Sequence, residues 1–236
     1  MNRKYSRENW PAHRFGASPK NFRPNEVRHS SARIVTSSLR RSYPEVFIIE
    51  SLASSDETAV PYEGQLIRDV LRMSGKHCEY RYIRTRRELM WAVQLFRDSQ
   101  YRYLHLSGHG SPSGYATTLD KISLDELGQL LRPALRDRCL FISACSMTNT
   151  ELANSVIPGS GCYSIVGPRK DIAFGDAFLL WASFYHLMFK RNEKAMKRAD
   201  IISTVHCIAT TFDVPLRYYS ASRSEKRGYR IRAVNP

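Results

Sequence analysis

The sequence predicts an α/β fold in which a mostly parallel central sheet is flanked by helices on both faces and ends in a C-terminal edge hairpin. From residue 45 onward, apolar runs of strand length alternate with segments whose apolar residues recur at helical spacing. Several of these runs are apolar throughout their centre, which is typical of strands buried on both faces. With 236 residues the chain is long enough for one substantial hydrophobic core.

The first part of this region alternates strands and helices. Strands are predicted over three runs rich in β-branched and aromatic residues: 45–50, 78–83 and 101–107. Helices are predicted around 66–71 and over 86–98, where apolar residues fall on one helical face. Ser123 and Glu126 form a capping box, so a third helix is expected to begin there and to run to about residue 131.

The second part continues the alternation. Strands are predicted at 138–144 and 162–167, helices near 174–190 and 193–210, and an edge hairpin from 216–222 and 229–234. The longest apolar run falls within the first of these helices and covers only 13 residues. Because a membrane span needs about 20 apolar residues, this run predicts a buried helix and no transmembrane segment.

The net charge of +14 belongs to the two ends of the chain. Residues 1–44 contain ten Lys or Arg against two acids, and residues 215–236 contain six against one, which leaves about +1 for residues 45–214. We therefore expect a basic, flexible N-terminal arm (1–44), a folded domain (45–214) and a basic C-terminal hairpin or tail (215–236). An electrostatic contact of the arm with nucleic acid, an acidic partner or an anionic surface stays open, as does a transit peptide.

Cysteine usage favours a reducing compartment. The five cysteines are odd in number and scattered, without a CxxC or a zinc-ligand spacing. No secretory signal opens the sequence. A cytoplasmic protein without a disulfide scaffold, a metal or another cofactor is therefore predicted.

Two reactive side chains follow consecutive strands of the predicted sheet. His109 lies in "YLHLSGHG", just past the strand at 101–107, and Cys145 lies in "LFISAC", just past the strand at 138–144. In parallel sheets, ligands bind beyond the carboxyl ends of the strands. If these two strands are neighbours, His109 and Cys145 emerge at the same edge of the sheet.

A Cys/His pair at such an edge is suited to nucleophilic catalysis. A strand-to-helix turn favours the thiolate of Cys145, and His109 is placed to exchange protons with the thiol, the leaving amine or water. The amides of Gly110 and Cys145 would form an oxyanion hole. His105 is expected to be a buried, hydrogen-bonded residue. A zinc site built from His105, His109 and Cys145 is disfavoured, because no carboxylate to complete it can be located.

The quoted motifs, together with "CYSIVGPRKDIAFGDAFLLWASFYHLMF", resemble the CHAT family of caspase-like cysteine peptidases over residues 45–210. The His-Gly and Ala-Cys elements are more distantly similar to those of caspases, separases and gingipains. The resemblance implies a caspase-hemoglobinase-like fold, with His109 and Cys145 as the dyad and Gly110 in the oxyanion hole. Ser143 and Ser146 stand where caspases have Gln and Arg or Gln, so the caspase preference for aspartate is not carried over.

The substrate pocket is expected to be lined by Glu50, Ser143 and Asp171. If Glu50 points into it, a basic residue before the scissile bond is favoured; the alternative is that Glu50 caps or pairs at the surface. The predicted function is a cysteine endopeptidase acting on protein or peptide substrates, regulated through an activating partner. Two rivals remain: a catalytically silent interaction module of the same fold, and a nucleic-acid-binding protein acting through its basic tails.

Overall fold

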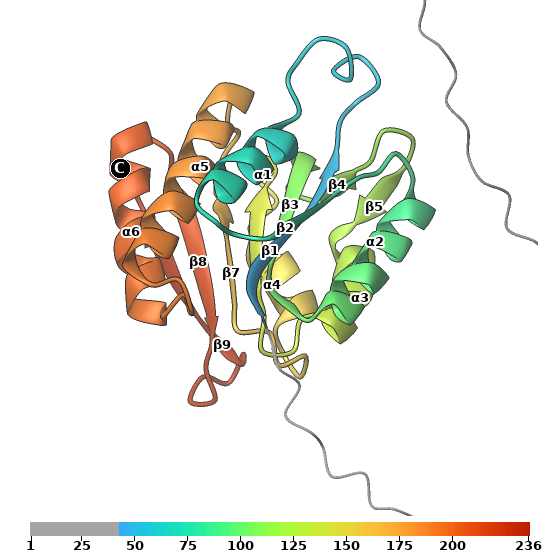
Figure 1. Ribbon diagram of the computed structural model, residues 1–236. Helices are drawn as coiled ribbons and strands as arrows, with labels where there is room; N and C mark the ends of the chain where they lie inside the picture. Colours follow the sequence, from blue (N-terminus) through green and yellow to red (C-terminus); the bar gives the residue numbers. More distant parts are fainter. Residues whose placement is uncertain (1–42) are drawn as a thin grey trace, which may run out of the picture. The chain divides into compact units, whose positions relative to one another are not determined.

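The computed structural model describes residues 43–236 (Figure 1). The N-terminal arm expected at 1–44 lies outside the described residues, except for Tyr43 and Pro44, which begin the first strand. The strands are β1 (Tyr43–Ser51), β2 (Cys78–Tyr82), β3 (Tyr101–Ser111), β4 (Gly114–Ala116), β5 (Lys121–Ser123), β6 (Cys139–Ser143), β7 (Ser164–Pro168), β8 (Leu216–Ala221) and β9 (Tyr229–Val234). The α-helices are α1 (Glu63–Met73), α2 (Arg86–Ser99), α3 (Leu124–Leu131), α4 (Thr150–Val156), α5 (Phe174–Arg191) and α6 (Arg198–Phe212).

Seven of these strands form a mixed sheet in the order β2-β1-β3-β6-β7-β8-β9. Strands β2, β1, β3, β6 and β7 pair in parallel, and the hairpin of β8 and β9 adds two antiparallel strands at one edge. This confirms the predicted α/β fold with its C-terminal edge hairpin. It also makes β3 and β6 direct neighbours, with Ser107 opposite Ser143 at their carboxyl ends.

Helices cover both faces of the sheet, with α1, α5 and α6 on one face and α2, α3 and α4 on the other (Figure 1). Successive residues of β1 divide between the two layers: Phe47 and Ile49 belong to one apolar cluster, Val46 and Ile48 to the other. On the α5 side, Phe141 of β6 packs against a cluster of aromatic side chains from that helix. The apolar run within α5 is therefore a core element. No helix among residues 43–236 is both long and apolar enough to cross a membrane.

Side-chain caps fix where several helices begin. Thr85 and Glu88 form a reciprocal capping box at α2, and the Ser123 hydroxyl accepts a hydrogen bond from the N–H of Glu126 at α3. Helix α6 begins at Arg198, five residues later than expected from the sequence. The reason is local, because the Asn192 side chain accepts hydrogen bonds from the N–H groups of Lys194 and Ala195 and holds this segment in a turn.

One part of the fold was not expected from the sequence. Strand β3 continues past Ser107 as far as Ser111, and the chain then folds back through β4 and β5 into a small antiparallel sheet. Strands β4 and β5 have three residues each, which is too short for a periodic pattern to indicate them. This extension of β3 carries His109 and Gly110 beyond the edge of the main sheet.

Candidate active site

His109 and Cys145 meet at the carboxyl edge of the parallel strands. Ser107 and Ser143 are register partners, and His109 and Cys145 each lie two residues beyond one of them. Both side chains line the same cavity of about 260 Å³. The structure thus brings together the two residues that the sequence nominated as a pair.

Glycines allow the two loops to touch. A Cβ atom at Gly110 would lie 2.8 Å from the carbonyl oxygen of Cys145 and 2.9 Å from the Cβ of Ala144. Gly108 has φ = +150°, and a Cβ there would lie 2.5 Å from the carbonyl oxygen of Ser51. The Gly-His-Gly pattern therefore permits close packing of the β3 extension against both the cysteine loop and the end of β1.

The imidazole of His109 has a carboxylate partner that sequence reasoning missed. Its Nε2 atom lies 2.6 Å from Oδ2 of Asp56, in the turn that follows β1. The ring also makes an edge contact with Phe174, at a centroid distance of 5.7 Å. With Nε2 engaged by Asp56, Nδ1 is the nitrogen left to exchange a proton with a substrate. The position of Asp56 after the first parallel strand, at the same sheet edge, was the available signal.

We expect Asp56→Asn to lower kcat by about 10- to 100-fold, because the amide no longer favours the imidazolium or the tautomer with a proton on Nε2. The pair is partly exposed, so its loss should change the free energy of unfolding little. The measurement is a pH–rate profile of both proteins beside a urea titration. Equal profiles would show that Asp56 does not act on His109 during turnover.

The loop after β7 holds the cysteine turn. The Sγ atom of Cys145 lies 3.8 Å from the carbonyl oxygen of Ile172. Ser146 has φ = +55°, and its hydroxyl donates to Asp171 at 3.0 Å. Cys145 lies in the turn between β6 and α4, as expected from the sequence, and Asn149 caps α4 four residues after it. The side chain of Cys145 is partly exposed into the cavity, as a nucleophile must be.

A buried carboxylate forms part of the cavity wall. Glu63 is 3% exposed and is the first residue of α1, where the helix dipole favours a negative charge. Its two oxygens accept hydrogen bonds from the hydroxyls of Ser107, at 2.5 Å, and Ser143, at 2.7 Å. Ser143, a residue that the sequence placed in the pocket, thus lines the cavity and also orients Glu63.

His105 lies behind this carboxylate, inside the core. Its Nδ1 is 3.0 Å from the hydroxyl of Tyr185, and its Nε2 is 3.8 Å from Oε1 of Glu63, without a hydrogen-bond partner. The ring packs edge-on against Trp181. His105 is therefore a buried neighbour of Glu63 and does not line the cavity. Among residues 43–236, no group of three His, Cys, Asp or Glu side chains is arranged to hold a metal ion.

Glu50 and Asp171 do not line this cavity. Glu50 is fully buried beneath α1, where it accepts hydrogen bonds from the N–H of Gly64, at 3.0 Å, and the hydroxyl of Tyr80, at 2.7 Å. Burial raises the pKa of Glu50 to about 7, and the negative charge of Glu63 acts in the same direction. Asp171 is exposed and pairs with the hydroxyl of Ser146. The acidic residue on the cavity wall is Glu63.

The pKa of Glu50 makes stability depend on pH. Its pKa is higher in the folded than in the unfolded state, so protonation of Glu50 favours folding. This contribution to the free energy of unfolding is complete below about pH 4.5 and is lost as the pH rises through 7. Between pH 5 and 8 the Glu50→Gln variant should gain about 2–3 kcal/mol in free energy of unfolding relative to wild type. Urea titrations at the two pH values test this. A constant difference between the two proteins would contradict it.

Comparisons with known proteins give structural matches only. No protein-family model and no curated protein matches the chain. Among solved structures, it is similar to the Arg-specific cysteine proteinase gingipain R (12% identity, TM-score 0.48, covering 72% of this chain and 42% of that one). It is also similar to the complex of the pro- and mature domains of RgpB from Porphyromonas gingivalis (13% identity, TM-score 0.46, covering 79% and 44%).

A third match is caspase-1 from Spodoptera frugiperda, with 12% identity, a TM-score of 0.47 and coverage of 82% of this chain and 86% of that one. The chain spans less than half the length of the gingipain chains that it matches. Likenesses of this degree do not transfer an activity to this chain. Its function has to be inferred from the geometry of its own site.

Proposed function

We propose that the protein is a cysteine endopeptidase with Cys145 as nucleophile and His109 as general acid and base. The observation that carries this proposal is the shared cavity, into which two neighbouring parallel strands deliver a partly exposed thiol and an imidazole. Asp56 supports the proposal because it orients the imidazole through Nε2. The resemblance of the His109 and Cys145 motifs to CHAT peptidases supports the same assignment.

The reaction follows from these positions. His109 accepts the thiol proton as Sγ of Cys145 attacks the carbonyl carbon of the scissile bond, and a C–S bond forms. The N–H groups of Gly110 and Cys145 stabilise the oxyanion. The C–N bond then breaks, and His109 gives its proton to the leaving amine. Water, deprotonated by His109, attacks the thioester, which releases the acid and regenerates the thiol.

Glu63 gives the cavity its chemical preference. A buried carboxylate that is held by two hydroxyls and lines the same cavity as Cys145 pairs well with a guanidinium or ammonium group. We therefore propose arginine or lysine as the residue before the scissile bond. This keeps the basic preference that the sequence suggested, with Glu63 in the role first given to Glu50.

Three expectations stay predictions: a cytoplasmic location, regulation by an activating partner protein, and contacts made by the basic tails. The alternative to a peptidase is a protein of the same fold that binds partners without cleaving them, the catalytically silent module. Mass spectrometry of a random peptide library incubated with the protein, alone and with cell extract, separates the two. New termini after Arg or Lys are expected. A library left intact under both conditions would favour the silent module.

A further inference from the structure

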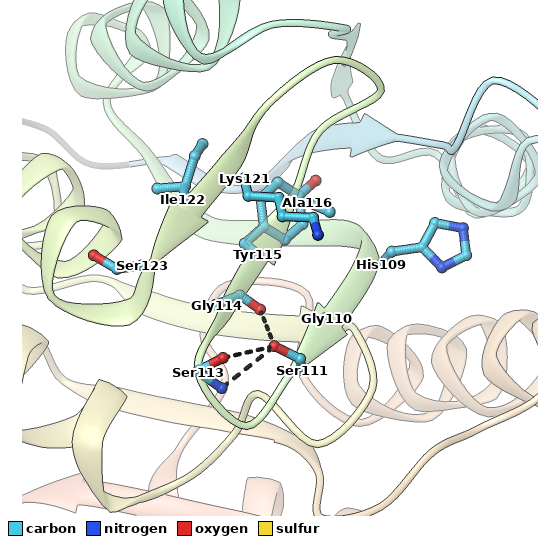
Figure 2. Close-up of a pocket in the computed structure, with 10 residues that line it drawn as sticks. All are labelled: His109, Gly110, Ser111, Ser113, Gly114, Tyr115, Ala116, Lys121, Ile122 and Ser123. Atoms are coloured by element: carbon cyan, nitrogen blue, oxygen red, sulfur yellow. Dashed lines mark hydrogen bonds between the residues drawn. The ribbon is translucent and has the colours of Figure 1, made fainter.

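His109 also lines a second cavity, of about 390 Å³, which Cys145 does not line (Figure 2). Its other lining residues come from the end of β3, from β4 and β5, and from the turn between β3 and β4. Both cavities therefore share the imidazole. One of them holds the nucleophile, and the other lies along the small antiparallel sheet.

The register of this sheet places a catalytic and a cationic side chain in one row. His109 is opposite Ala116, and Ala116 is opposite Lys121. Directly opposed residues of antiparallel strands project from the same face, so the imidazole, a methyl group and the Lys121 side chain follow one another across that face. Figure 2 shows Lys121 beside Ala116 and His109 at one side of the group.

The remaining rows show that this face is the open one. Ser111, Gly114 and Ser123 form the next row on the same face, and both serines are exposed. The intervening row turns Tyr115 and Ile122 into the core, where each is at most 2% exposed. The outward face is thus lined by hydroxyls, small residues and one ammonium group.

The ammonium group of Lys121 is available to a ligand. The three acids closest to it in sequence have other partners. Asp120 accepts a hydrogen bond from the N–H of Arg86 at 2.7 Å, Asp125 accepts one from the side-chain amide of Gln129 at 2.8 Å, and Glu126 forms an ion pair with the Arg86 guanidinium. Within the part of the chain that the structure describes, Lys121 forms no salt bridge. No carboxylate lines the cavity.

We infer that this second cavity receives the leaving side of the substrate and that Lys121 selects a carboxylate there. The inference rests on the proposed peptidase function. In that function, the basic residue occupies the cavity with Glu63, and the leaving amine faces His109, which protonates it. The part of the substrate beyond the leaving amine then extends on the His109 side, along the row of residues that ends at Lys121.

The strand spacing predicts which substrate residue meets Lys121. Opposed residues have Cβ atoms about 5 Å apart. Two such spacings, from His109 to Ala116 and from Ala116 to Lys121, place the Cβ of Lys121 about 10 Å from that of His109. A substrate residue advances the chain by about 3.3–3.6 Å. Lys121 is therefore expected to pair with aspartate or glutamate at the second or third position after the scissile bond.

The test uses internally quenched peptides with one Arg before the bond and an amidated C-terminus, so that the only variable carboxylate is a side chain. Twin peptides carry Asp or Asn at the second or third position. Wild type should cleave at least one Asp peptide with a kcat/KM about two- to five-fold above that of its Asn twin. Lys121→Gln should remove the difference, and Lys121→Glu should favour a Lys-containing peptide instead. Lys226→Gln, which changes an exposed lysine of the β8–β9 turn, is the matched control.

An arginyl aminomethylcoumarin substrate separates this inference from the proposed function, because it has no residues on its leaving side. Wild type and Lys121→Gln should cleave it equally. If wild type cleaves it but treats Asp and Asn twins alike, the role of Lys121 is overturned and the peptidase stands. If wild type cleaves no substrate, the proposed peptidase function is wrong. Binding of the twin peptides, measured by fluorescence polarisation, then tests whether Lys121 selects a carboxylate. Tighter binding of Asp peptides that Lys121→Gln abolishes supports its role, and equal binding overturns it.

Discussion

Cys145→Ala is expected to lose peptide cleavage by about 10⁴-fold or more, because removing the nucleophile leaves only the oxyanion hole and substrate binding. The thiol is partly exposed and makes one weak contact, so the variant should keep the fold of the parent. The measurement is kcat/KM on an arginyl peptide, with a thermal melt of each protein.

The matched control is Cys207→Ala, because Cys207 is the exposed cysteine of α6 and does not line the cavity with His109. This variant should keep full activity. Retained cleavage in Cys145→Ala, or its loss in Cys207→Ala, would place the nucleophile elsewhere.

Glu63→Gln is expected to remove the preference for a basic residue. Wild type should cleave an arginyl peptide about 100-fold faster than its citrulline twin, since citrulline has the shape of arginine without the charge. Breaking one partner of a buried, hydrogen-bonded charge pair commonly costs 2–5 kcal/mol, which is about 30- to 4,000-fold in kcat/KM. The variant should cleave the two peptides at similar rates, because its kcat/KM falls for the arginyl peptide and stays unchanged for the citrulline peptide.

Glu50→Gln is the control for this experiment. Glu50, in β1, is the other buried glutamate near the N-terminus of α1, but it accepts hydrogen bonds from Gly64 and Tyr80 and does not line the cavity. Its substitution should leave the arginine preference intact. A selectivity that survives Glu63→Gln and changes with Glu50→Gln would return the role to Glu50.

The framework of the fold could be predicted because it depends on local pattern. The central strands are apolar throughout, as in "FII" and "CLFI", and amphipathic helices lie between them. Right-handed connections then imply a mostly parallel sheet, whereas the order of its strands, in which β3 and β6 are neighbours, comes from the structure. The positions of His109 and Cys145 just past strand ends were therefore visible in the sequence, and the structure brings both to one cavity.

The acidic residues of the site, Glu63 and Asp56, could not be predicted in the same way. Residues on both faces of β1 are apolar, so the sequence does not say which face Glu50 joins. In the structure it lies two residues after Ile48, on the face covered by α1, and is buried there. Glu63 lines the cavity only because α1 begins at that residue, which depends on tertiary packing. Asp56 lies in a turn without a periodic pattern, so the only indication of its role was its position after the first parallel strand.

The central claim is that Cys145 attacks a carbonyl held in the cavity it shares with His109. Its most direct test is covalent labelling with an arginyl acyloxymethyl ketone, followed by peptide mapping of the adduct by mass spectrometry. We expect one adduct per chain, located on Cys145, and a much slower reaction in His109→Ala. An adduct on another cysteine, or none under conditions in which the protein is folded, would contradict the claim.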